Sequence, residues 1–139
     1  MPRPIRVLPD APLALIQYLG ARSEVTAVVP ASRITTAIPS NPTYPLVIVQ
    51  RVGGLSVAKE NIDEAALQVS VFHTLDKQQE CSLVARTIRA AIVAIQNDSV
   101  SAGVLVSGWE ETGPQWLPDT TTTPPLARFV ARYQVITHP

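Results

Sequence analysis

The stretch ALQVSVFHTLDKQQECSLVARTIRAAIVAIQN, residues 66–97, carries the two clearest hydrophobic patterns of the chain. Over its first eight residues, 66–73, apolar and polar side chains alternate, which is typical of a strand with one buried face. We therefore predict a strand there. Its inward residues are Leu67, Val69 and Val71, and its outward residues are Gln68, Ser70 and Phe72.

The rest of this stretch changes to a helical period. Apolar residues recur every three or four positions, which predicts a long amphipathic helix over residues 76–97. Asp76 with Gln79 predicts a capping box at its start, and Asn97 is suited to a left-handed residue at its end. The apolar stripe comprises Cys81, Val84, Ile88, Ala91, Ile92 and Ile95.

The segment before the strand supplies its expected partner. Residues 46–52 form an apolar run of high β-propensity, and no proline lies between residues 46 and 113, so backbone ladders can run without interruption. We predict that the two strands pair antiparallel. The twelve residues between them, 53–64, are too many for a tight hairpin turn, which predicts a charged loop that projects from the body.

Towards both ends the chain is richer in proline, and the elements expected there are shorter. They are a helix over 10–20 with Asp10 as N-cap and Gly20 as its end, a strand over 25–29, a loop over 31–45 with room for an extended segment at 34–38, a strand over 100–109, a long loop over 110–126, and a last strand over 128–138 that turns Phe129, Ala131, Tyr133 and Val135 inward.

This order of elements predicts an α+β fold. We expect a single mixed or antiparallel β-sheet with one long helix packed across it and a short N-terminal helix. A length of 139 residues is that of one domain, so the expected unit spans residues 1–139.

The composition points to association. Hydrophobic residues make up 46% of the chain and charged residues only 16%, while eleven basic residues balance eleven acidic ones. A charge balance of zero argues against a reader of duplex DNA, which needs a basic face, and it opposes self-association least. The single cysteine excludes an intrachain disulfide and favours synthesis in the cytosol, and we expect neither a signal peptide nor a membrane span.

The sequence contains no clear catalytic or cofactor-binding motif. Gly53 and Gly54 lack the further glycines of a phosphate-binding loop, and two histidines make no recognisable metal site. Cys81 and His73 are conceivable as a nucleophile and its base, but Cys81 falls on the apolar stripe of the helix. We therefore expect no enzyme and no cofactor.

The better candidates are interface residues. Trp116 lies between two prolines in the long loop, where an aromatic side chain can anchor a partner, whereas Trp109 is expected to close the core. Arg128 and Arg132 on the outer face of the last strand either contact solvent or pair with a neighbouring subunit. The full candidate set is Arg51, Lys59, Glu60, Asp63, Trp116, Arg128 and Arg132.

Several segments in this order resemble the tail-terminator, or tail-completion, proteins of long-tailed bacteriophages. They include YPLVIVQRVGG at 44–54, LQVSVFH at 67–73 and ARTIRAAI at 85–92, as well as GPQWLPD at 113–119 before the strand ARFVARY. The helix end LIQYL at 15–19, the strand expected at 25–29 and the pair Asp63-Glu64 also fit. The resemblance covers nearly the whole chain and includes no catalytic motif.

The resemblance implies a structural virion protein. Such proteins form a ring, usually a homo-hexamer, that caps the head-proximal end of the tail tube, stops its polymerisation and joins the tail to the head connector. The implied partners are further copies of the chain, the tail tube protein and the head-tail connector or stopper. Genome DNA would pass through the lumen without sequence-specific binding. The implied location is the neck of the virion, after assembly in the host cytoplasm.

Three alternatives remain open at this point. The chain could be another neck component such as a head-tail adaptor, a tube subunit that polymerises by itself, or a small α+β enzyme that uses His73 and Cys81. A protein of a bacterial prophage or contractile-injection system would share the same chemistry.

Overall fold

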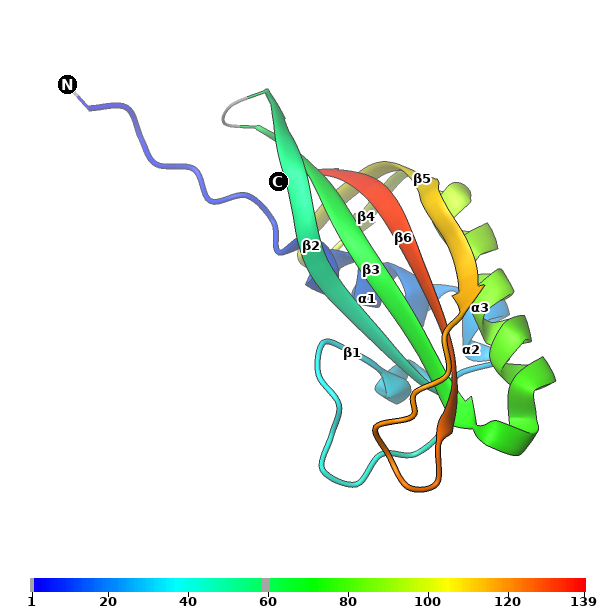
Figure 1. The fold of residues 1–139 in the computed structure, drawn as a ribbon. Coiled ribbons are helices and arrows are strands. Elements are labelled where there is room, and N and C mark those ends of the chain that lie inside the picture. The colour runs from blue at the N-terminus through cyan, green and yellow to red at the C-terminus, as the bar shows by residue number, and fades with distance from the viewer. Residues whose placement is uncertain (1, 59–60) are drawn as a thin grey trace.

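A computed structural model describes residues 2–58 and 61–139 of the chain, without the side chains of residues 56–58. Its strands form one six-stranded sheet in the order β1-β2-β3-β6-β5-β4 (Figure 1). Only β1 and β2 are parallel, and all other pairs are antiparallel. The predicted α+β class with one mixed sheet is confirmed. The strands are β1 (Ile34–Thr35), β2 (Leu46–Ala58), β3 (Ile62–Thr74), β4 (Gln96–Val100), β5 (Gly103–Trp116) and β6 (Leu126–His138).

The two principal helices lie where the sequence places them, with shifted ends. Helix α1 (Ala11–Ala21) begins after Asp10, whose carboxylate accepts from the Leu13 N–H at 3.5 Å, and it ends one residue beyond Gly20. Helix α3 (Gln78–Val93) follows a 3-10 turn over Leu75–Lys77.

The predicted ends of α3 need correction. The capping box of Asp76 and Gln79 does not form, because Lys77 occupies the N-cap and makes no side-chain cap. The helix stops at Val93, and Asn97 takes the expected left-handed conformation (φ 51°) only after a turn, inside β4. That strand was not expected.

The strand predicted over 25–29 is wrong. Helix α2 (Ser23–Thr26) ends within this segment, and the Val29 N–H bonds to the Val25 carbonyl at 3.0 Å, which continues the helical turn. Both valines are fully buried. Two buried residues four apart fit a helical turn, and β-branched side chains there mimic a strand. The possible extended segment at 34–38 shortens to the two residues of β1.

The connection predicted as a loop over 53–64 is a β-hairpin. Strand β2 continues to Ala58 and β3 starts at Ile62, with Gly53, Gly54 and Leu55 paired to Ala66, Ala65 and Glu64. A register shift between Arg51 and Gly53 marks a bulge in β2 at this point. Glycine can adopt the irregular backbone conformation of a bulge. The hairpin extends past the other strands, so the expected projection is present in another form (Figure 1).

The loop predicted over 110–126 is also shorter than expected. Strand β5 runs to Trp116, because register shifts on either side of Thr112 accommodate Gly113 and Pro114 in the part of β5 that lies beyond its pairing with β4. The remaining loop covers residues 117–125, and β6 begins at Leu126 rather than at residue 128.

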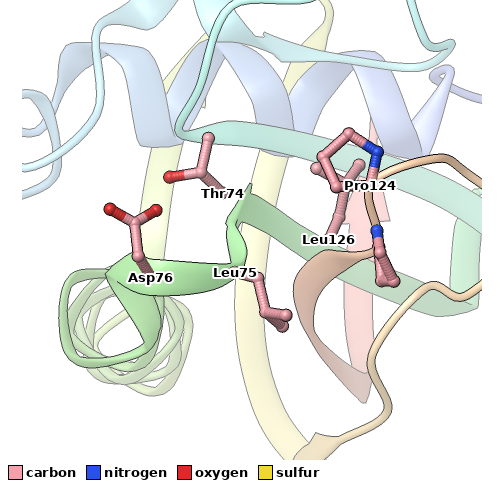
Figure 2. Close-up of a pocket in the computed structure, with 6 residues that line it drawn as sticks. Thr74, Leu75, Asp76, Pro124 and Leu126 are labelled. Carbon is pink, nitrogen blue, oxygen red and sulfur yellow. The ribbon is translucent and has the colours of Figure 1, made fainter.

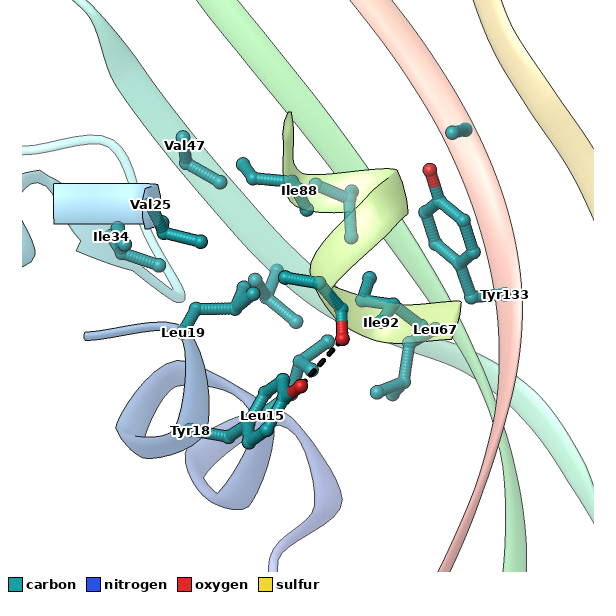
Figure 3. Close-up of a cluster of buried hydrophobic side chains, with 14 of the residues drawn as sticks. Leu15, Tyr18, Leu19, Val25, Ile34, Val47, Leu67, Ile88, Ile92 and Tyr133 are labelled. Atoms are coloured by element: carbon teal, nitrogen blue, oxygen red, sulfur yellow. Dashed lines mark hydrogen bonds between the residues drawn. The ribbon is translucent and has the colours of Figure 1, made fainter. Parts of the chain in front are cut away.

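Helices cover one face of the sheet, and the hydrophobic core lies between the helices and that face (Figure 3). The Tyr18 hydroxyl crosses it to donate to the Ala91 carbonyl at 2.6 Å, joining α1 to α3. Tyr133, Ala131 and Val135 point into the core as expected, while Phe129 is only half-buried.

Over the part of the chain that the structure describes, no helix lies on the opposite face (Figure 1). Its middle row is polar, with Gln50 paired to Gln68 and Gln68 paired to Arg132. At one end Leu46, Ile48 and Phe72 form a small second cluster. Trp109 pairs with Gln134 on this face and is 39% exposed, so the expectation that it closes the core is wrong.

Candidate assembly surface

The two sides of the sheet are open along most of their length. Strand β1 pairs with β2 only at Val47 and Ile48, and β4 pairs with β5 only as far as Ser107. Beyond these points, within the residues that the structure describes, β2 and β5 have no strand on their outer sides. Unpaired backbone groups at a strand edge are suited to bind another chain.

Each of these two edges carries two exposed large apolar side chains. Val52 is 42% and Leu55 is 69% exposed on β2, and Trp109 is 39% and Trp116 is 40% exposed on β5. We call Arg51 to Leu55 the β2 edge, and Trp109 to Trp116 the β5 edge. Solvent contact with large apolar groups is unfavourable, so both edges favour coverage by protein.

Arg51 holds the base of the β2–β3 hairpin. Its guanidinium donates to both oxygens of Asp63, at 2.5 and 2.8 Å. Asp63 is buried, whereas the Arg51 side chain is 40% exposed, and its hydrogen bond to Asp63 raises the pKa of Arg51. Gly54 leaves the room for this, because a Cβ there would lie 2.6 Å from the guanidinium. The paired hydrogen bonds to Asp63 therefore keep the Arg51 guanidinium fixed at the β2 edge.

Two of the remaining candidates lie near the end of β5. Trp116 packs edge-to-face on Phe129, with ring centroids 5.3 Å apart. Arg128 donates to the Leu117 carbonyl at 2.7 Å and lies over the Phe72 ring at 5.9 Å, so it ties the following loop to the sheet.

Arg132 is exposed on the face without helices. It lines a shallow hollow of about 270 Å³ together with Gln68, Glu111, Thr112 and Gln115. The structure thus distributes the predicted residues over two edges and one face, rather than in one site. Lys59 and Glu60, also predicted for the interface, lie outside the described residues.

Sequence reasoning missed Val52, Leu55 and Trp109 as surface residues. A single sequence gives neither the order of the strands nor how far they pair, and β2 and β5 are open because the outer strands β1 and β4 pair with only part of them. One sequence feature could have indicated the open edge of β5. Pro114 lies within this strand, and proline is tolerated in edge strands.

An apolar groove lies at the end of the sheet opposite to the hairpin tip. Figure 2 shows Leu75 facing Pro124 and Leu126 across it, with Thr74 and Asp76 on one rim. Its volume is about 630 Å³. The groove lies where β3 ends and β6 begins, so it belongs to the end surface of the sheet.

The residues considered for catalysis do not form a dyad. The Cys81 thiol is fully buried and donates to the Val71 carbonyl at 3.3 Å, and burial raises its pKa to about 11. The His73 ring nitrogen Nδ1 accepts from the Thr74 N–H at 2.8 Å, and burial lowers the pKa of this imidazole. A buried neutral thiol is a poor nucleophile.

Within residues 2–58 and 61–139, no group of three or more His, Cys, Asp or Glu side chains could hold a metal ion. In the same part of the chain no helix is both long and apolar enough to cross a bilayer.

Comparisons with known proteins give a family from the sequence and a shared fold from a solved structure. The family model "Tail completion protein gp17" matches residues 13–138. Among solved structures, a chain of the "Virion of native gene transfer agent (GTA) particle" is similar, with a TM-score of 0.67 and 17% sequence identity over 92% of this chain and 94% of that chain. At this identity the similarity shows a shared fold. No curated protein sequence matches the chain significantly.

Proposed function

Because the chain belongs to the tail completion protein gp17 family of phage tail proteins, we propose that it is the tail terminator of its particle. In this role it caps the head-proximal end of the tail tube, stops tube polymerisation and joins the tail to the head connector. The coarser statement, that it is a structural protein of a phage tail, follows from the family itself. The proposed unit is the whole chain, acting as one domain.

The proposed working form is a ring, of six copies. The observation that carries it is the pair of open, partly apolar edges on opposite sides of one sheet. Two different surfaces on opposite sides of a subunit make head-to-tail contacts, and such contacts close into a ring when the rotation between copies is right. The low charge of the chain is consistent with a subunit flanked by neighbours on both sides.

The two ends of the sheet are proposed to meet different partners. At one end the β2–β3 hairpin projects, and Arg6 of the N-terminal segment bonds to Asn61 there at 3.0 Å (Figure 1). At the other end lie the groove and the loop over 117–125 (Figure 2). We assign the hairpin end to the tail tube protein and the loop end to the connector or stopper.

Genome DNA passes through the ring in this proposal without sequence-specific binding. Eleven basic residues balance eleven acidic ones, so the chain as a whole offers little net attraction for phosphates. The proposed location is the neck of the virion, and assembly takes place in the host cytoplasm.

Self-assembly of the purified protein tests this function. A tail terminator should stop at a closed ring, whereas a tube subunit should grow into filaments and a head-tail adaptor should bind the connector without binding tubes. Trp116→Ala and Arg132→Glu should weaken the ring and leave the monomer folded: Arg132 is exposed, and Trp116, although it packs on Phe129, lies outside the buried core. Filaments of the wild-type protein would refute the terminator role.

A further inference from the structure

The pairing registers place residues of the two open edges at the same position along the strand direction. We call this position the height of a residue on the sheet. Arg51 of β2 is opposite Leu67 of β3, Leu67 is opposite Tyr133 of β6, and Tyr133 is opposite Glu110 of β5. One row therefore begins with a cation on one edge and ends with an anion on the other.

The next row is apolar at its β5 end. Gly53, directly after Val52, is opposite Ala66, which leads through Gln134 to Trp109. Val52 and Trp109 thus lie near the same height, next to the charged row, and each is about 40% exposed. Matching chemistry at matching heights is the arrangement needed for one copy to meet the next.

We propose that the β2 edge of one copy contacts the β5 edge of the next, with Val52 against Trp109 and Arg51 against Glu110 and Glu111. The inference rests on the proposed ring. A rotation about an axis parallel to the strands leaves heights unchanged, so rows of equal height meet. β2 and β5 run antiparallel within one copy, and the same rotation keeps them antiparallel across the contact.

Each charged group is already oriented by its own chain. Arg51 is held by Asp63, Glu110 by Arg89 of α3, and Glu111 accepts from Gln134 at 2.8 Å. A carboxylate has about four acceptor sites and a guanidinium five N–H donors, so these bonds leave capacity for a partner. Side chains fixed in this way lose little further entropy on binding.

The contact is made chiefly by side chains. Bulges around Thr112 and the proline at 114 interrupt the outer side of β5, which protects it against indiscriminate strand addition. The two edges also differ from each other in charge and in shape. A symmetric dimer therefore cannot pair the β2 edge of one copy with the β5 edge of the other on both sides. In a head-to-tail contact each copy keeps one edge unpaired, and that edge can bind a further copy.

Crosslinking between engineered cysteines tests this contact. The double variant Val52→Cys with Trp109→Cys is treated with a short bis-maleimide, and the products are separated under denaturing conditions. We expect a ladder of covalent multimers that ends at the ring. The native Cys81 is buried and serves as an internal background in every variant.

Three controls make the result specific. Each single variant should give no interchain product, because the contact joins different surfaces. Val52→Cys paired with Leu75→Cys should also give none: Leu75 follows Thr74, which lies eight residues along β3 from Ala66, about 27 Å away, and its side chain is 41% exposed.

Native mass spectrometry of the same samples separates the two claims. A ring without the ladder, or with equal crosslinking in the Leu75 control, refutes this contact and leaves the terminator proposal in place. A crosslinked dimer from either single variant also refutes the contact, because it requires a symmetric pair. Wild-type protein that forms no ring refutes both.

Discussion

Replacing Trp109 by alanine should weaken the ring without unfolding the subunit. The side chain is 39% exposed in the isolated chain. A tryptophan presents up to about 250 Å² of surface, so close to 100 Å² remains for a partner to cover. At about 25 cal/mol per Å², that area contributes about 2.5 kcal/mol to each contact.

Alanine keeps a small part of this area, so the expected loss is about 2 kcal/mol per contact, or roughly 30-fold in its equilibrium constant. Native mass spectrometry over a dilution series measures it as a shift of ring dissociation to higher protein concentration. A thermal melt of the dissociated subunit should stay cooperative with a lowered midpoint, because the subunit itself covers the part of the Trp109 side chain that is not exposed.

Leu83→Ala is the matched control for this substitution. Leu83 is 44% exposed on α3, outside both open edges, so its removal should leave ring dissociation where the wild type has it. Equal dissociation curves for wild type and Trp109→Ala would refute the reasoning, and so would an equal shift for both variants.

Three further predictions concern the fold. Tyr18→Phe removes the hydroxyl that donates to the Ala91 carbonyl and should lower the free energy of unfolding by about 1 to 3 kcal/mol in urea titrations. Tyr44→Phe should change it little, since within the described residues no hydrogen bond of its hydroxyl is found. Gly108→Ala should destabilise by about 1 to 3 kcal/mol in the same assay, because its Cβ would lie 2.7 Å from a carbonyl oxygen of α3; wild-type stability would contradict the close packing. Burial raises the pKa of Cys81 from 9.0 to about 11, so the unfolded chain loses this proton first, and stability should fall by up to about 2 to 3 kcal/mol as pH rises from about 9 to 11. Cys81→Ala should show a shallower decline in unfolding titrations over that range, and an identical slope would contradict it.

The sequence predicts the centre of the fold well. The alternation over β3 and β6 and the helical stripe of α3 each follow from burial on one face, and periodicity records burial directly. The sequence also predicts Asp10 as the N-cap of α1, because a carboxylate just before an apolar helix binds a backbone N–H group only a few residues away in sequence.

The errors occur where tertiary pairing overrides local propensity. Gly53 and Gly54 are typical of loops, yet β3 pairs with them and makes them strand residues. Pro114 is tolerated because β5 has a bulge at an open edge. Val25 and Val29 favour a strand by residue type, but the backbone turns helically between them.

The two open edges that form the proposed assembly surface were predictable only in part. Arg51 and Trp116 were identified from residue type, and the structure places them on the two open edges. Val52 and Trp109 could not be identified, because their exposure depends on how far the outer strands β1 and β4 extend along β2 and β5. Strand order is a property of long-range pairing, which no local pattern contains.

Native mass spectrometry of the purified wild-type chain, with negative-stain images of the same sample, tests the central claim most directly. Six subunits of 15.0 kDa give a mass of about 90 kDa. The account predicts this mass together with a ring that has a central hole. Filaments, or a compact dimer without a hole, would contradict it.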